Sequence, residues 1–392
     1  MPSTPLTLAA LATSAVPGLD VVAVREHSYG GEGSYATAVL TTPDDEVIIR
    51  VPRDPAAEVR QSAEMLGLSA LTEGARSALP FDVPETLGIT RAGDTRAVVS
   101  TFLPGGLISV EDLEADALLV QPIAEAVGAI HHLPTSLVHQ AGLPMRSADD
   151  VRDDATRIVE RAAGTGLLPG VVQARWSDAL AAARLWDFAP TVIHGSLDAG
   201  QLLIADDRIV GVLGWDRFGV GDPAVDLAWL LAADADVFDA VLARYLRGSA
   251  GGAAAALRAR ARFTHELEVA RWLLHGVETH DDAVIADAVA MLDRLVDRLN
   301  RLDGSEAERP PAPASVTEVV RMLDETPPLP DDPRSETAEY DALDEERVFT
   351  SDADFADDGP LVTDPDAADV LSGEPGSEPG GEPGSEPGGG AR

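Results

Sequence analysis

The sequence predicts an α+β chain in three parts: a small lobe built on an antiparallel five-stranded sheet, a mainly helical lobe, and an acidic tail. Three observations predict this division. Short apolar runs of strand character dominate residues 1–103, apolar residues at helical spacing dominate residues 104–303, and Pro, Gly, Ser, Asp and Glu dominate residues 304–392. We expect the tail to be disordered, because its composition cannot bury enough apolar surface to offset the loss of chain entropy.

The first part shows a pattern of strands and turns that follows one short helix. The helix is expected to end at Ala15, and Pro55 is expected to open a second helix that runs to about residue 73. Along this second helix apolar residues recur at helical spacing, namely Ala56, Val59, Ala63, Leu66 and Ala70. Strands are expected over residues 19–26, 35–41, 46–51, 83–89 and 96–103.

The second part has helical periodicity that is interrupted by one stretch of short strands. The residues Pro104-Gly105-Gly106 break the chain and are interpreted as a hinge between the lobes. Helices are expected over residues 110–132, 148–163, 171–186, 237–246, 253–277 and 281–302. Within residues 191–231, apolar runs bounded by Gly or Asp predict buried strands at 191–193, 202–205 and 209–213, followed by a helix that opens at Asp222-Pro223.

Charge and composition exclude several classes of partner. The formal net charge is −38, and residues 304–392 carry 24 acidic residues against 5 arginines. Such a surface repels phosphate backbones and anionic lipid, so we expect neither nucleic acid nor membrane as a partner. The absence of Cys excludes disulfides and thiolate chemistry. A cytoplasmic location follows most simply, because no basic residue precedes the apolar N-terminal run and no long uncharged apolar run occurs.

Two motifs in residues 191–231 carry a resemblance to a known family. The first reads HGSLDAGQ, from His194 to Gln201, and the second reads GWD followed by GDPAVDLA, from Gly214 to Ala228. They resemble the aminoglycoside and macrolide phosphotransferase family, in which the first motif reads H-G-D-x-x-x-x-N and the second reads I-D-W followed by G-D-P-x-x-D-L-A. The resemblance covers roughly residues 5–300 and implies a bilobal protein kinase-like fold.

Three positions depart from the family motifs. The resemblance implies an Asp that accepts the proton of the attacking hydroxyl, an Asn that holds one Mg²⁺, and an Asp that holds metal on the nucleotide phosphates. This chain carries Ser196, Gln201 and Gly214 at those positions. Serine is no base at neutral pH without a partner, and glycine offers a cation no side-chain ligand, so the binding of Mg²⁺ is in question. Asp198 and Asp216 each follow a missing Asp by two residues and are either substitutes for it or exposed loop acids.

The positions that would hold a nucleotide are better kept. Arg50 lies where kinases place a Lys that pairs with phosphate, and Glu64 in the next helix is its expected partner; the alternative is that both are surface charges. Ser100 and Phe102 lie in residues 99–102, which the resemblance implies would supply the backbone amides that bind adenine. A glycine-rich loop can admit phosphates to backbone amides or can simply form a hairpin turn. Its glycines are Gly30, Gly31 and Gly33.

Several other polar residues are expected to be structural. His194 is expected to hold its loop by hydrogen bonding, and Asp222 and Asp226 to cap the start of a helix. The pairs His131-His132 and His265 with His275 lack the carboxylate or Cys spacing of a metal site.

Three functions therefore stay open, and whether the chain is an enzyme is left uncertain. The first is a phosphotransferase-fold protein that has lost ordinary Mg·ATP chemistry and acts by binding a nucleotide, a small molecule or a protein. The second is an active small-molecule O-phosphotransferase with a rearranged site that uses Asp198 or Asp216. The third is a scaffold that acts through the acidic tail. ATP or another nucleotide is the expected cofactor in the first two.

Overall fold

A computed structural model describes residues 4–27, 33–110, 113, 117–233, 235–247 and 251–307. The predictions for Gly30, Gly31 and the acidic tail therefore lie outside the described residues. Met1–Pro310 form one compact unit. The lobe boundaries expected at residues 103 and 303 stay predictions.

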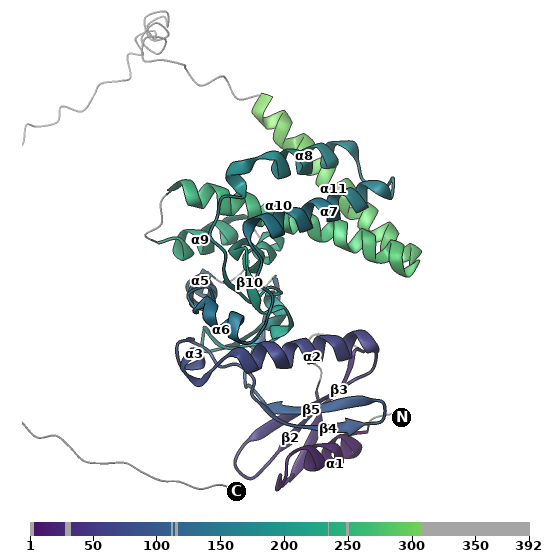
Figure 1. Ribbon diagram of the computed structural model, residues 1–392, viewed down its shortest axis with the longest axis vertical. Helices are drawn as coiled ribbons and strands as arrows, with labels where there is room; N and C mark the ends of the chain where they lie inside the picture. Colours follow the sequence, from purple (N-terminus) through teal and green to yellow (C-terminus); the bar gives the residue numbers. More distant parts are fainter. Residues whose placement is uncertain are drawn as a thin grey trace, which may run out of the picture. The chain divides into compact units, whose positions relative to one another are not determined.

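An antiparallel sheet of five strands forms the N-terminal part of this unit, in the order β1-β2-β3-β5-β4 (Figure 1). The prediction of five strands with one long helix after the third is confirmed, although the fourth strand begins three residues later than expected. The elements are α1 (Pro5–Ala15), β1 (Ala23–Glu26), β2 (Tyr35–Thr41), β3 (Glu46–Pro52), α2 (Pro55–Ala70), α3 (Glu73–Ser77), β4 (Thr86–Ala92) and β5 (Thr95–Thr101).

One face of the sheet packs against α1, and the other face lines a cavity. Figure 1 shows α1 and α2 on opposite sides of it. Leu8 and Ala12 of α1 pack with one set of strand residues into a closed core, which includes Leu40, Ile49 and Val99. Because strand side chains alternate between faces, the neighbouring residues Ile48, Arg50 and Ser100 point to the second face. That face lines the cavity described below.

The long helix α2 turns a different face inward from the one that its apolar spacing indicates. Val59 and Leu66 are 69% and 53% exposed, whereas Gln61 and Glu64 are buried. The physical reason is that both polar residues have partners: the Gln61 amide donates to the carbonyl of Arg96 at 3.1 Å, and Glu64 accepts from Arg50. Hydrogen bonds thus allow these two polar residues to lie on the buried side of α2, together with Ala57, Leu68 and Ala70.

A glycine lets α2 approach the loop that follows β9 (Arg208–Val212). A Cβ on Gly67 would lie 2.2 Å from the carbonyl oxygen of Trp215, a distance that a side chain cannot occupy. The backbone of η4 (Trp215–Arg217) therefore packs directly on α2. Because Glu64 lies one turn before Gly67 on α2, this contact also fixes the position of Glu64 relative to the segment that carries Gly214 and Asp216.

Helices dominate the rest of the described chain, as predicted. Two further apolar cores are present: one around α5 and the short strands, and one between α7, α8, α10 and α11. No helix among the described residues is long and apolar enough to cross a membrane. The elements are η1 (Ala117–Leu119), α5 (Val120–His131), α6 (Thr135–Gln140), α7 (Ala148–Gly164), α8 (Gly170–Ala181), η2 (Ala183–Leu185), α9 (Ala235–Tyr245), α10 (Gly251–Thr279) and α11 (Asp282–Ala307).

The short strands of residues 191–231 form two small sheets, β10-β7 and β6-β8-β9. The strand β6 (Gly106–Leu107) pairs with β8, so the break at residues 104–106 leads straight into a sheet rather than into a free hinge. The helix expected at Asp222-Pro223 is instead a pair of 3-10 helices. The remaining elements are β7 (Thr191–Ile193), η3 (Ala199–Gln201), β8 (Leu202–Ala205), β10 (Gly219–Gly221), η5 (Pro223–Asp226) and η6 (Ala228–Ala232).

Candidate functional site

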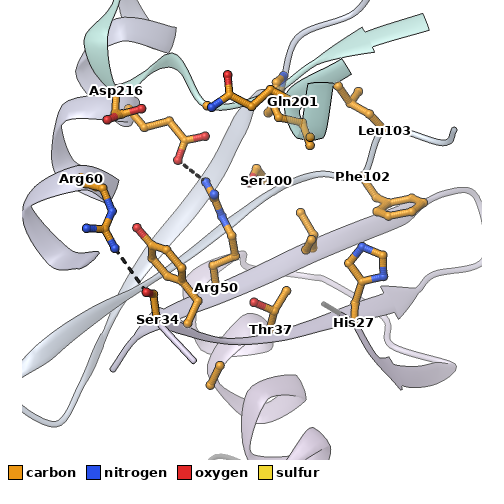
Figure 2. A pocket seen from close by; sticks show the side chains of 18 of the residues that line it. His27, Ser34, Thr37, Arg50, Arg60, Ser100, Phe102, Leu103, Gln201 and Asp216 are labelled. Carbon is orange, nitrogen blue, oxygen red and sulfur yellow. Dashed lines mark hydrogen bonds and ion pairs between the residues drawn. The ribbon is translucent and has the colours of Figure 1, made fainter. Parts of the chain in front are cut away.

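A cavity of about 950 Å³ opens between the second face of the sheet and the loops around η3 and η4. This volume lies within the roughly 300–1,000 Å³ of ordinary ligand pockets. In Figure 2, Arg50 and Ser100 approach from the sheet, and Gln201 and Asp216 approach from the other side. Nine of the predicted site residues line the cavity: Gly33, Arg50, Glu64, Ser100, Phe102, Asp198, Gln201, Gly214 and Asp216. Neither His194 nor Ser196 is among the lining residues.

Arg50 and Glu64 form the ion pair that the sequence predicts. The Nη2 of Arg50 donates to Oε2 of Glu64 at 2.6 Å, and Glu64 is 5% exposed, so the alternative of two surface charges is wrong. Burial lowers the pKa of Arg50, but the charge of Glu64 and its hydrogen bond outweigh burial and hold the pKa above its usual value. The guanidinium is thereby charged and held in one direction before any ligand arrives.

Asp226 organises the loop that begins at His194. Its carboxylate is fully buried and accepts the backbone N–H of His194 and the backbone N–H of Gly195, both at 2.7 Å. Burial would raise the pKa of Asp226, but hydrogen bonding to His131 and the neighbouring charges outweigh burial and lower the pKa. Asp226 therefore has a structural role, as expected, but not the expected one of capping a helix. Its carboxylate binds the backbone of residues 194–195, which are distant in the sequence.

His131 is a member of this network that sequence reasoning missed. Its Nε2 lies 3.0 Å from Oδ2 of Asp226, and its Nδ1 lies 2.8 Å from the hydroxyl of Tyr245. Burial and the negative charge of Asp226 raise the pKa of Tyr245 to about 12, so its hydroxyl keeps its proton at neutral pH. No local signal could have joined residues 131, 226 and 245, because only packing brings them together.

Asp222 makes a second buried link. It accepts from the backbone N–H of Ala224 at 2.9 Å, which is the capping role expected, and from Nε of Arg260 in α10 at 2.7 Å. The two buried carboxylates Asp222 and Asp226 are both satisfied, so neither is available to a metal or a substrate.

His194 is buried, and its Nε2 donates to the carbonyl of Leu213 at 2.9 Å. This bond places the proton on Nε2 and joins the loop of residues 194–201 to the loop that carries Gly214. Its Nδ1 has no hydrogen-bond partner among the described residues. The expected structural role of His194 is thus the one that the geometry supports.

The buried imidazole of His194 predicts a loss of stability in mild acid. Burial lowers its pKa below the ordinary 6.5, so the unfolded chain takes up the proton first, and stability falls as pH drops below about 6.5. One such group contributes a slope of up to about 1.4 kcal/mol per pH unit. We expect His194→Gln to flatten the fall in unfolding free energy between pH 7 and 5, measured by urea titration. The exposed His139, replaced by Gln, is the control and should leave the slope unchanged; equal slopes in all three proteins would contradict the expectation.

Ser196, at the position of the catalytic base, faces the backbone of the opposite loop. Its hydroxyl donates to the carbonyl of Gly214 at 3.1 Å and lies 3.4 Å from Oδ1 of Asp216. Asp216 therefore stands beside the base position and lines the cavity. Asp198 is exposed on the cavity side, but the surrounding protein partly desolvates its carboxylate and thereby raises its pKa. Hydrogen bonds from the Gly200 and Gln201 amides act against this rise.

Gln201 fills the space that a side chain at position 214 would need. Gly214 has a φ of +80°, and a Cβ built on it would lie 2.7 Å from Nε2 of Gln201 and 2.8 Å from its Cδ. The side-chain carbonyl oxygen of Gln201 is buried and has no hydrogen-bond partner among the described residues. The two departures from the metal-binding motif, Gln201 and Gly214, are thus neighbours in space. The Gln201 amide, which is one methylene longer than that of Asn, lies over the glycine.

A family model described as a phosphotransferase enzyme family (APH) matches residues 29–265. The chain belongs to this family. A comparison with curated protein sequences finds no match.

Solved structures of other family members share the fold. Macrolide 2'-phosphotransferase MphH from Brachybacterium faecium is 23% identical, with 74% of this chain and 98% of that chain covered and a TM-score of 0.60. The GDP and kanamycin complex of APH(2")-IIia is 17% identical, with 75% and 99% covered and a TM-score of 0.62. ADP-bound APH(2'')-Ib is also 17% identical, with 70% and 92% covered and a TM-score of 0.53. At these identities the likeness establishes a bilobal kinase-like fold.

The Mg²⁺ that the phosphotransferase family implies does not fit the residues of this chain. The position of the metal carboxylate is Gly214, and the space beside it holds the Gln201 amide. Among the described residues, no group of three or more His, Asp or Glu side chains could hold a metal ion. Mg²⁺ prefers carboxylate oxygens, and a lone amide oxygen is a poor replacement for Asn and Asp together.

In this family member, two backbone amides of the segment expected to bind adenine donate to nearby carbonyls. The backbone N–H of Thr101 donates to the carbonyl of Glu85 at 2.9 Å, and that of Phe102 donates to the carbonyl of Glu46 at 3.2 Å. These two amides are therefore already bonded to carbonyls of the protein, and the binding of adenine by residues 99–102 stays a prediction. The Phe102 ring lines the cavity and packs edge-on against His27, with 5.6 Å between ring centroids (Figure 2).

Proposed function

We propose that this member of the phosphotransferase family binds a nucleotide or small molecule in the cavity and catalyses little or no Mg·ATP-dependent phosphoryl transfer. The contact between Gln201 and Gly214 carries this proposal. A carboxylate lost from an otherwise open site would leave room for water and metal. Here the Gln201 side chain occupies the space beside Gly214, so the protein packs against the glycine that replaces the carboxylate.

Two losses act together on the chemistry. A general base contributes roughly 10²–10⁴-fold to a rate, and Ser196 supplies none because a serine hydroxyl is no base at neutral pH. Its hydroxyl donates to the Gly214 carbonyl. Metal charge on the phosphates stabilises much of the transition state, and position 214 has no side chain with which to hold it. The binding features are retained, namely the cavity and the fixed Arg50–Glu64 pair.

The test is ATP turnover by the full chain with excess Mg²⁺, with and without mixed aminoglycosides and macrolides, beside thermal shift with ATP. We expect nucleotide to raise the melting temperature and turnover to stay at the background of a protein-free control. The matched binding control is Arg50→Gln, which should remove most of the thermal shift because the fixed guanidinium is lost. Rapid Mg²⁺-dependent turnover by the unmodified chain would overturn the proposal.

A second function has one observation in its favour, namely the carboxylate of Asp216 at 3.4 Å from the Ser196 hydroxyl. If that carboxylate takes the proton in place of the missing Asp, the chain is an active O-phosphotransferase with a rearranged site. Asp216→Asn should then lower turnover by roughly 10²-fold or more. Asp207→Asn, a change at an exposed turn with a backbone that Asn tolerates, is the control and should leave turnover intact. Equal turnover in both variants excludes this function.

A further inference from the structure

We propose that the cavity holds the phosphates of a nucleoside polyphosphate through arginine side chains, without a bridging metal ion. This inference rests on the nucleotide binding proposed above and adds how the phosphates are held. It starts from the misfit between Mg²⁺ and positions 201 and 214. A polyphosphate that is not neutralised by metal needs cationic or donor groups from the protein itself.

Three arginines that line the cavity can supply these groups. Arg50 lies in β3, Arg53 lies between β3 and α2, and Arg60 lies in α2. Arg50 is held by Glu64, and Arg60 donates to the Ser34 hydroxyl at 3.3 Å (Figure 2). A guanidinium presents paired donors that match phosphate oxygens, so two or three of them can grip a polyphosphate directly.

Two of the three arginines keep their charge unpaired. Arg53 and Arg60 form no ion pair with any described residue. Other arginines nearby are engaged: Arg25 with Glu46, Arg96 with Glu58, and Arg76 with the carbonyls of Leu68, Leu71, Val83 and Pro84. Both arginines are exposed and line the cavity, so their charges are free to meet an anionic ligand there.

The opposite wall agrees with a metal-free arrangement. Where the family places two oxygen ligands for a cation, this chain presents the Gln201 amide, whose N–H₂ can donate straight to a phosphate oxygen. The carboxylates of Asp198 and Asp216 also line the cavity and repel an anion, whereas the carboxylate of Glu64 is paired with Arg50. The phosphates are therefore expected on the arginine side, against Arg53 and Arg60.

Titration calorimetry on the full chain tests the inference. ATP is titrated in excess EDTA and again in excess Mg²⁺, and inorganic triphosphate and adenosine are titrated in EDTA. We expect ATP to bind in EDTA, with an affinity that Mg²⁺ does not improve and that falls as salt rises. Adenosine and triphosphate should each bind more weakly than ATP. Arg53→Gln and Arg60→Gln should each weaken ATP binding about tenfold in EDTA.

Arg91→Gln, at an exposed arginine of β4 that lies outside the cavity, is the matched control and should bind ATP as the unmodified chain does. Binding of ATP that requires Mg²⁺ overturns the inference while leaving the proposed nucleotide binding intact. Adenosine that binds as tightly as ATP overturns it as well, because the phosphates are then not held. Triphosphate that binds as tightly as ATP overturns the nucleoside part. No ATP binding in either buffer defeats the proposed function itself.

Discussion

The triple variant Ser196→Asp/Gln201→Asn/Gly214→Asp is expected to hydrolyse ATP in a Mg²⁺-dependent manner, at least about 10²-fold faster than the unmodified chain. The three changes restore the base and both metal ligands that the family motif carries. The parts that position a nucleotide need no change, because the Arg50–Glu64 pair and the loop held by Asp226 are already formed. Phosphate release from ATP, with Mg²⁺ or with EDTA, is the measurement.

None of the three changes alone is expected to restore ATP hydrolysis. The interaction between the changes at positions 201 and 214 can be measured as a coupling in unfolding free energy. Gly214→Asp alone puts a side chain at a φ of +80°, where a non-glycine residue costs about 1–2 kcal/mol, and it displaces the Gln201 amide. Gln201→Asn shortens that amide by one methylene and opens the space. The two changes should therefore couple by about 0.5–3 kcal/mol in unfolding free energy, which a double-mutant cycle in urea measures. Additive effects within about 0.5 kcal/mol would contradict the packing described for this pair.

Replacement of Asp226 by Asn is expected to cost about 3–5 kcal/mol of unfolding free energy. The side chain is fully buried and is the shared acceptor for the backbone N–H groups of His194 and Gly195 and for His131. Asn keeps the shape but removes the charge and turns an N–H₂ toward groups that donate. Buried donors left without an acceptor cost about 1–3 kcal/mol each.

The measurement for Asp226→Asn is a urea titration at pH 7. Asp187→Asn changes the same residue type at an exposed position and should shift the free energy by less than about 0.5 kcal/mol. His131→Phe removes one donor while it keeps a ring in place, and it should fall between the two. An Asp226→Asn protein as stable as the Asp187→Asn protein would show that the network does not hold the loop.

Local patterns predicted most elements correctly, because each depends on neighbours in the sequence. The strands at residues 35–41, 191–193 and 202–205 agree with the structure residue for residue. The apolar spacing along α2 predicted the helix but not its buried side, since Gln61 and Glu64 are buried with partners on other elements, whereas Val59 and Leu66 are exposed.

The sequence by itself determined the family and the three altered positions, because motif residues can be read without coordinates. The tertiary structure alone decided what the alterations mean. Residues 201 and 214 are thirteen positions apart, and only the pairing of β8 with β9 brings the Gln201 amide over Gly214. Likewise, only the folded chain brings Arg50 of β3 and Gln201 of η3 to one cavity. Such contacts depend on long-range packing, which local periodicity does not encode.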